Sequence, residues 1–428
     1  MGEELMRKVW SICADRYGAA LPDVIFNRLQ QELQNITVNV FSEDYLSTSG
    51  ISLELQHCNA LQICLGTVGN SFVAYLLGIT EINPLPPHYR CPHCKRVIFV
   101  SDVLDGFDLP PQDCPVCRTP MEGDGHHLHV AWFTGWDGTC PPAFGEFRMT
   151  PKGIQITEQA LKKHSPLTPL AFSDGRFAGW YLCNSETLSH AEWMQLTYPG
   201  HPNHIVPGVK YDCDLPEPRI LVHDSVFLRK LEWLSDVTGV ELSSIPMNNP
   251  AIYNAFCRAI EYDTADAGNL LCTTGLCASE ELLSDRFTFW RRASKSGLSF
   301  SRLVSLYGVM HMSVRHSSAL DLSTALTFSD RDSVMEYLIR QGLPPKDAFQ
   351  TADNMRYGRF AHMPADAYPV FIQGINDDGF FFHAAQNTEY LFPRAHNSAV
   401  VMNAVRLAWF SIYEPSAFRE VQDIAHTP

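Results

Sequence analysis

The sequence contains no long apolar run and no excess of positive charge. None of the 428 residues falls in a stretch of the about 18 uncharged apolar residues that a membrane-spanning helix needs. The opening MGEELMRKVW is acidic and lacks the apolar core of a secretory signal, so we expect a cytoplasmic protein. No repeats or low-complexity tracts are evident. The 45% hydrophobic and 18% charged residues indicate a chain that folds throughout.

Acidic residues outnumber basic ones by 47 to 32, which gives a net charge of -15. Proteins that grip DNA usually carry a basic surface, because neutralisation of phosphates supplies most of the affinity. The charge therefore counts against strong autonomous DNA binding and favours a protein partner, although a local basic groove is compatible with it.

The 13 cysteines do not form a disulfide pattern, since their number is odd and most are scattered. Two CxxC motifs stand out: CPHC at 91–94 and CPVC at 114–117. Two such motifs can complete a closed tetrahedral site of four thiolates, which suits a structural zinc ion. The alternatives are ligation by His93 or the histidines at 126–129, and a redox or chance pairing. The expected ligands are Cys91, Cys94, Cys114 and Cys117.

The pattern of apolar residues predicts an α+β front half and a helical back half. Residues 1–40 read as helices, and residues 61–79 as a strand, a glycine turn and a buried helix. Short strand-like runs, broken by proline and glycine, follow the cysteine motifs, with examples at 127–133, 179–183 and 219–223. From about residue 225 every periodic segment predicts a helix.

Long segments of the chain resemble the PolC-type DNA polymerase III alpha subunit, a replicative polymerase of Gram-positive bacteria. The most specific is NPLPPHYRCPHC (83–94) with GFDLPPQDCPVC (106–117), around the cysteines. The resemblance covers most of the chain and is weakest at 145–215. Its other segments are 21–36, 66–89, 220–250, 334–349 and 390–415.

The resemblance implies a nucleotidyltransferase-like palm remnant with an inserted zinc module, followed by an all-helical, fingers-like domain. We expect a palm-like segment at 1–89, the zinc module at 90–130, a degenerate palm remnant at 131–224 and the fingers-like domain at 225–428. The family's exonuclease, PHP and OB regions and its clamp-binding motif have no counterpart in this sequence.

The family's palm uses three aspartates to hold two metal ions. Aligned through FTGWDGTCPPAFGEF (133–147), two of these positions fall on Ala143 and Gly145. Aligned through PRILVHDS (218–225), the third falls on Arg219. None of the three can bind a divalent ion, and a guanidinium inverts the local charge. Mg²⁺ binding is therefore not expected.

The resemblance also implies a damaged triphosphate site. A family arginine falls on Leu65, in the glycine turn CLGTVGNS (64–71), and the glycines are expected to serve packing, with a phosphate cradle as the alternative. His201 and His204 offer an alternative second metal site. The retained candidates for nucleotide or DNA contact are Arg394, His396, Arg356, Arg359 and His311.

These observations predict a pseudo-polymerase that binds DNA or replication proteins, as a decoy or accessory factor, and is not an enzyme. A phage or mobile element is a natural source of such a protein. Two alternatives stay open: a gene fragment without function, and an active DNA polymerase with rearranged metal ligands. The carboxylates available to the latter are Asp137, Glu146, Asp212, Asp214 and Asp224.

Overall fold

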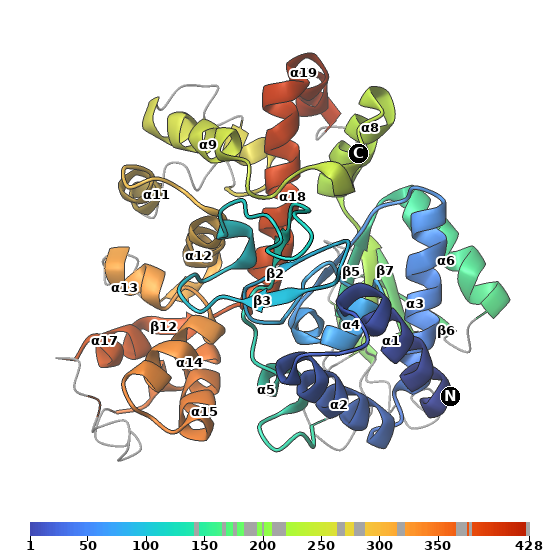
Figure 1. Ribbon diagram of the computed structural model, residues 1–428, viewed down its shortest axis with the longest axis horizontal. Coiled ribbons are helices and arrows are strands. Elements are labelled where there is room, and N and C mark those ends of the chain that lie inside the picture. The colour runs from blue at the N-terminus through green and yellow to red at the C-terminus, as the bar shows by residue number, and fades with distance from the viewer. Residues whose placement is uncertain are drawn as a thin grey trace.

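A computed structural model describes most of the chain (Figure 1). The described residues are 1–140, 145–164, 168–173, 178–183, 195–198, 201–207, 220–262, 270–277, 287–314, 322–364, 375 and 379–424. Side chains of 162–221, 223 and 224 are outside the description, as are those of 262, 322 and 422–424.

The front half is a mixed sheet covered by helices, as the sequence predicted for an α+β protein. The five-stranded sheet has the order β1-β5-β10-β7-β6. Strand β5 lies between β1, which is antiparallel to it, and β10, which is parallel to it. Its strands are β1 (Gln62–Leu65), β5 (Gly145–Met149), β6 (Thr168–Ser173), β7 (Ala178–Cys183) and β10 (Ile220–Asp224); β8 (Gln195–Tyr198) and β9 (His201–Pro207) pair separately.

Helices from the first 164 residues pack on one side of this sheet, where Phe147, Met149 and Val222 belong to their hydrophobic core (Figure 1). The predicted strand, glycine turn and helix at 61–79 are present as β1, the 3-10 turn η1 (Thr67–Asn70) and α4. The helices are α1 (Gly2–Tyr17), α2 (Asp23–Val38), α3 (Ser42–His57), α4 (Phe72–Leu76) and α6 (Pro151–His164).

Two of these helices were missed in the sequence. The buried face of α3 includes Ser49 and Ser52, so it shows little hydrophobic periodicity. The start of α6 carries a local signal that the strand-like prediction for 127–222 overlooked. Thr150 accepts a hydrogen bond from the Gly153 N–H at 3.2 Å, and Pro151 occupies the first helical position.

The cysteine motifs lie in a small module built on a three-stranded sheet of order β3-β2-β4. Its elements are β2 (His88–Arg90), β3 (Val97–Phe99), the 3-10 turn η2 (Gly106–Asp108) and β4 (Glu122–Asp124). The strand predicted at 127–133 is wrong. The N–H groups of His126, His127 and Leu128 donate to carbonyls of 83–85, and the chain then enters the short helix α5 (Ala131–Thr134).

Within its described residues, the back half is helical except for one short ribbon, which corrects the all-helical expectation. Strands β11 (Ser313–Val314) and β12 (Thr388–Tyr390) pair antiparallel. The pairing satisfies backbone groups where α12 and α17 end. The helices are α8 (Val226–Thr238), α9 (Pro250–Tyr262), α11 (Phe287–Ser294), α12 (Phe300–His311), α13 (Leu322–Thr327), α14 (Arg331–Arg340), α15 (Pro345–Arg356), α17 (Phe380–Asn387), α18 (Arg394–Tyr413) and α19 (Pro415–Ile424).

Helix α18 joins the two halves. It contacts β1 and η1 of the front half, and it packs against α8, α9, α12 and α19 of the back half (Figure 1). Most of its residues are buried, which explains why its apolar residues are not confined to one side. None of the helices within the described ranges is both long and apolar enough to cross a membrane.

Candidate metal centre and the remnant of a polymerase site

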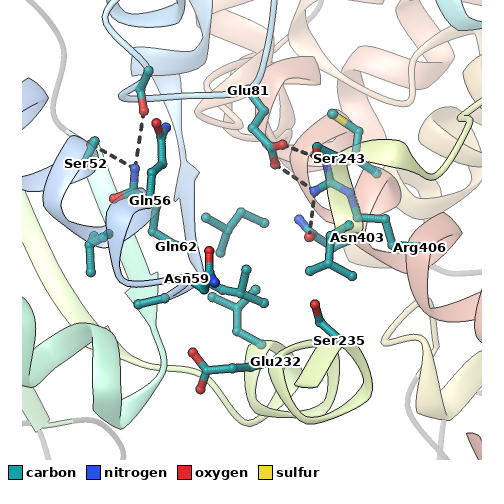
Figure 2. A pocket seen from close by; sticks show the side chains of 18 of the residues that line it. Ser52, Gln56, Asn59, Gln62, Glu81, Glu232, Ser235, Ser243, Asn403 and Arg406 are labelled. Atoms are coloured by element: carbon teal, nitrogen blue, oxygen red, sulfur yellow. Dashed lines mark hydrogen bonds and ion pairs between the residues drawn. The ribbon is translucent and has the colours of Figure 1, made fainter. Parts of the chain in front are cut away.

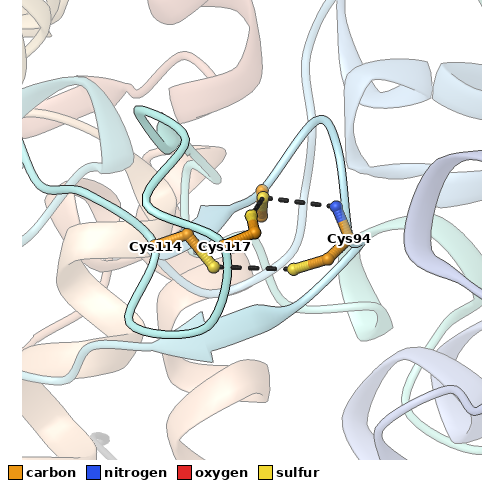
Figure 3. Close-up of side chains that lie close together, drawn as sticks. Cys94, Cys114 and Cys117 are labelled. Atoms are coloured by element: carbon orange, nitrogen blue, oxygen red, sulfur yellow. Dashed lines mark hydrogen bonds between the residues drawn. The ribbon is translucent and has the colours of Figure 1, made fainter.

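The four predicted cysteines converge in two equivalent turns. In each turn the residue after the second cysteine, Lys95 or Arg118, has a φ of 62°. The N–H of Lys95 donates to the carbonyl of Cys91 at 3.1 Å, and that of Arg118 to the carbonyl of Cys114 at 2.9 Å. This geometry turns both sulfurs of a CxxC motif toward the same point, as Figure 3 shows for Cys94, Cys114 and Cys117.

The spacing of the sulfurs fits a tetrahedral metal ion. The Sγ atoms of Cys91 and Cys117 lie 3.4 Å apart, and those of Cys94 and Cys114 lie 3.5 Å apart. All four lie within 4.8 Å of one another. A tetrahedral zinc with bonds of about 2.3 Å to sulfur separates its ligands by about 3.8 Å. The buried cluster can therefore bind a metal ion such as zinc.

Two of the four cysteines favour the thiolate form that a metal ion requires, whereas at Cys94 the lowering effect of the Arg96 backbone is outweighed by desolvation and hydrogen bonds with the other three cysteines, which raise the pKa to about 12. The Thr119 hydroxyl lies 3.3 Å from the Sγ of Cys117 and, with the Thr119 N–H, lowers the pKa of Cys117 to about 5. Backbone N–H groups of Cys117 and Val116 lower the pKa of Cys114. Within the described part of the chain, the histidines considered as alternative ligands are not part of the cluster.

The two strands expected to carry the family's aspartate positions are neighbours in the central sheet. Gly145 on β5 is opposite Ile220 on β10. Ala143 and Arg219 lie outside the described residues. A Cβ atom at Gly145 would lie 3.4 Å from Val68 and 3.7 Å from the Cys64 sulfur, so this position faces the core of the front half.

The opposite face of β5 carries charge. Glu146 and Arg148 alternate with the buried positions, and the Nε of Arg148 donates to Glu146 at 2.8 Å. Both act electrostatically on His396 of α18, as does His311. Burial is the largest cause that lowers the pKa of His396, to about 4, so this ring is neutral at pH 7. Of the β5 positions, it is Glu146 rather than Gly145 that faces the helical half.

The other carboxylates proposed as substitute ligands do not gather at this face in the described structure. Asp137 is exposed and lies 3.9 Å from Lys346. Asp212 and Asp214 are outside the described residues, as are the side chains of Asp224, His201 and His204. Among the described side chains, the four cysteines are the one group of three or more potential metal ligands.

Arg394, the first nucleotide-contact candidate, is buried in an ion-pair cluster of the helical half. Its Nη1 donates to Glu336 at 2.7 Å, and its Nε lies 3.5 Å from Asp330. Its Nη2 donates to Ser333 at 3.0 Å, and its backbone N–H donates to Asp332 at 3.0 Å. The positive charge is therefore already balanced by carboxylates of this chain.

The other candidates separate into two places. Arg356 and Arg359 flank the ring of Tyr357, with guanidinium carbons 4.2 Å and 5.5 Å from the ring centroid. Tyr357 is 43% exposed, so this group forms an accessible cationic and aromatic surface at the end of α15. His311 instead stacks on Tyr307 at 4.0 Å and acts electrostatically on His396.

The glycine turn before α4 serves packing, as expected. A Cβ atom at Gly69 would lie 2.7 Å from the Cβ of Ala395, because the turn lies directly against α18. The buried Glu32 carboxylate accepts the N–H groups of Phe72 and Val73 at 3.0 Å each. The start of α4 thus already holds an anionic group of this chain, which no local sequence signal revealed.

The sequence did not predict a cleft of about 620 Å³ between α3, β1, α8 and α18 (Figure 2). An ion pair of Arg406 with Glu81, at 2.6 Å and 2.8 Å, forms one wall. Gln62 and Glu232 lie on other sides of it (Figure 2). None of the predicted site residues lines this cleft.

Comparison with known families places the chain among the relatives of bacterial replicative polymerases. Residues 3–142 match the family described as the bacterial DNA polymerase III alpha NTPase domain. The matched region includes the first four helices, the four-cysteine module and the approach to β5.

Whole-chain comparison finds that most of the chain is similar to PolC-type DNA polymerase III. It is 27% identical over 459 residues to that protein of Ureaplasma parvum, covering 93% of this chain and 31% of the relative. The protein of Bacillus cereus is 27% identical over 457 residues, and that of Streptococcus suis 28% over 463, with the same coverage. The chain thus spans about a third of the length of these relatives, and the predicted resemblance is confirmed.

Proposed function

We propose that this PolC-type homologue acts in DNA replication by binding, without adding nucleotides. The observation that carries the proposal is the Glu146–Arg148 ion pair on the face of β5 that meets α18. A two-metal site needs unpaired, clustered carboxylates, and here an adjacent guanidinium neutralises the acid. In the alignment, Ala143, Gly145 and Arg219 stand at the family's aspartate positions.

In this proposal the chain has the four parts expected from the sequence: palm-like segments at 1–89 and 131–224, the metal module at 90–130 and a fingers-like region at 225–428. Zinc occupies the four-cysteine site as a structural ion, because four thiolates at this spacing leave no open coordination position. Such a site supplies folding energy to a small module.

Exposed Tyr357 and Arg359, with the half-buried Arg356 beside them, form the surface that we propose for DNA contact. An exposed aromatic ring close to guanidinium groups suits a single-stranded segment, such as the template beyond a primer terminus. Arg394 has a structural role here, since its charge is paired inside the helical half.

A primer-extension assay with Mg²⁺ and with Mn²⁺ tests the absence of nucleotide addition. We expect no incorporation by the purified chain. Incorporation that disappears in Asp224→Ala would contradict the proposal and support the alternative, an active polymerase with rearranged ligands.

Fluorescence anisotropy with a labelled primer–template tests the binding surface. Tyr357→Ala should weaken binding about tenfold, since stacking of one base contributes about 1–3 kcal/mol. Arg359→Ala should lower the slope of log affinity against log salt by about 1. The matched control is Arg419→Ala, an exposed arginine on α19. Equal affinity of all variants would exclude this surface, and a pull-down for replication proteins would then decide between DNA and a protein partner.

A further inference from the structure

A half-buried carboxylate of the four-cysteine module contacts the helical half. Asp108, in η2, accepts the N–H of Phe300 at 2.7 Å and the N–H of Ser301 at 3.2 Å. It also accepts the hydroxyl of Ser299 at 3.1 Å. These groups form the start of α12, about 190 residues later in the chain, where unpaired N–H groups and the helix dipole favour an anion. A residue of the module thus caps a helix of the other half.

An aromatic contact lies beside the cap. The rings of Phe107 and Phe300 meet edge to face, with centroids 4.9 Å apart. The ring of His126 lies 5.0 Å from Phe107, and its Nδ1 lies 2.7 Å from the Asp105 carboxylate. Polar and apolar contacts therefore both hold η2 against the first turn of α12.

The turn η2 lies within the loop between the two CxxC motifs and is anchored to β4. The N–H of Gly106 donates to the carbonyl of Gly125 at 2.7 Å. A Cβ atom at Gly106 would lie 2.0 Å from the carbonyl oxygen of Asp124, so only glycine allows this approach to β4. The loop runs from Cys94 to Cys114, and an ion bound to both would close it.

The other side of the module is attached to the front half through polar groups of its own. Asp124 accepts the hydroxyl of Tyr75 at 2.7 Å and the amide of Asn83 at 2.8 Å. The Asn83 amide also donates to Tyr17 of α1 at 3.0 Å. The module therefore lies between the N-terminal helices and α12, as Figure 1 shows for β2 and β3.

Helix α12 in turn packs closely on α18. A Cβ atom at Gly308 would lie 2.4 Å from the carbonyl oxygen of Ser329 and 2.8 Å from the amide of Asn397. The last residue of α12, His311, acts electrostatically on His396, as do Glu146 and Arg148 of β5. The position of α12 therefore affects the helical residues that face Glu146 on β5.

We propose that the four-cysteine module is a metal-dependent latch, in which the bound ion fixes the loop that carries Asp108 and Asp108 holds the start of α12. Asp108 is a positioning residue in this scheme. The inference rests on the metal binding proposed above, and it is independent of whether the chain binds DNA or adds nucleotides.

Hydrogen–deuterium exchange of the full chain, with zinc analysis of each sample, tests the latch. In Asp108→Ala the amides of Phe300 and Ser301, whose N–H groups Asp108 accepts, should exchange about tenfold faster while zinc content is unchanged. In Asp108→Asn, which keeps one acceptor oxygen, the exchange rates of these amides should lie between those of Asp108→Ala and the wild type. The control Asp102→Ala removes an exposed carboxylate of the same loop and should leave α12 unchanged.

Removal of zinc from the wild type by a chelator should expose the same amides and leave α1 and α2 protected. Protected α12 amides in the chelated protein, with exposed amides at 91–117, would refute the link between ion and helix. Loss of protection in α1 and α2 as well would also refute it, since the ion would then support the whole chain. Normal exchange in Asp108→Ala would refute the cap. Absence of zinc from the purified protein would overturn the metal link, whereas nucleotide incorporation would contradict only the proposed function.

Discussion

Replacement of Arg394 by alanine distinguishes a structural arginine from a ligand-binding one. Its side chain is 10% exposed and pairs with Glu336, which is 25% exposed, and with Asp330, which is 1% exposed. Removal of one partner from a buried ion pair costs about 3–5 kcal/mol, because the remaining charge is left unpaired. We expect a loss of about 3 kcal/mol in the free energy of unfolding at pH 7, at the lower end because Glu336 is partly exposed.

The loss should depend on pH in a defined direction. Burial alone raises the pKa of Glu336, but the Arg394 guanidinium outweighs it and holds the pKa below its ordinary value. The ion pair therefore stabilises the fold above the ordinary pKa of a glutamate, and this contribution disappears as the pH falls through the lowered pKa. In Arg394→Ala the main opposing charge is lost, so burial outweighs the smaller lowering effects of His127 and Arg340 and the pKa of Glu336 rises. Protonation then relieves the unpaired charge as the pH is lowered toward 4.

Urea denaturation followed by circular dichroism at pH 7 and at pH 4.5 measures both effects. Arg394→Lys keeps the positive charge but not the bidentate contact with Glu336, so it should lose less than half as much stability as Arg394→Ala. The exposed Arg359→Ala should change the free energy of unfolding by less than about 0.5 kcal/mol. A loss below about 1 kcal/mol for Arg394→Ala, or a loss equal at both pH values, would refute the structural role.

Two further predictions concern the metal site and the glycine turn. Metal analysis of the purified chain should give about one zinc per molecule, and Cys91→Ser with Cys117→Ser should abolish it; stoichiometric zinc in that variant would rule out the four-cysteine assignment. Gly69→Ala should destabilise the fold by about 1–3 kcal/mol, because the added Cβ overlaps Ala395. Gly50→Ala in α3, with nothing within 4 Å of its added Cβ, should instead stabilise it by about 0.5–1 kcal/mol, and equal thermal shifts in the two variants would contradict this reasoning.

Local patterns predicted α8, α12 and α14 well, because each carries apolar periodicity and a start signal. Ser225, Ser299 and Asp330 cap α8, α12 and α14 with their side chains, as residues of these types do at helix starts. The pattern failed for α3, whose buried side contains small polar residues, and for 127–133, whose backbone bonds to the proline-rich connector at 83–87 rather than to a strand. In both places distant packing outweighed local preference.

The candidate site was predictable only where its residues are close in sequence. Each CxxC motif forms one tight turn, and the sulfur cluster follows when the two turns meet. By contrast, Gly145 was assigned to one of the family's aspartate positions only by aligning the sequence. A slip of one residue moves a side chain to the other face of a strand, and the structure shows Glu146 rather than Gly145 on the charged face.

The sequence by itself determined the α+β class, the four-cysteine cluster and the kinship with PolC-type polymerases, because these depend on residue types at short, regular spacings. Only the tertiary structure decided that Arg394 pairs with Glu336, that Glu32 occupies the start of α4 and that Asp108 caps α12. Each of these contacts joins residues that lie tens to hundreds of positions apart. No local pattern encodes such a pairing, since it arises only when packing removes water from both charged or polar partners.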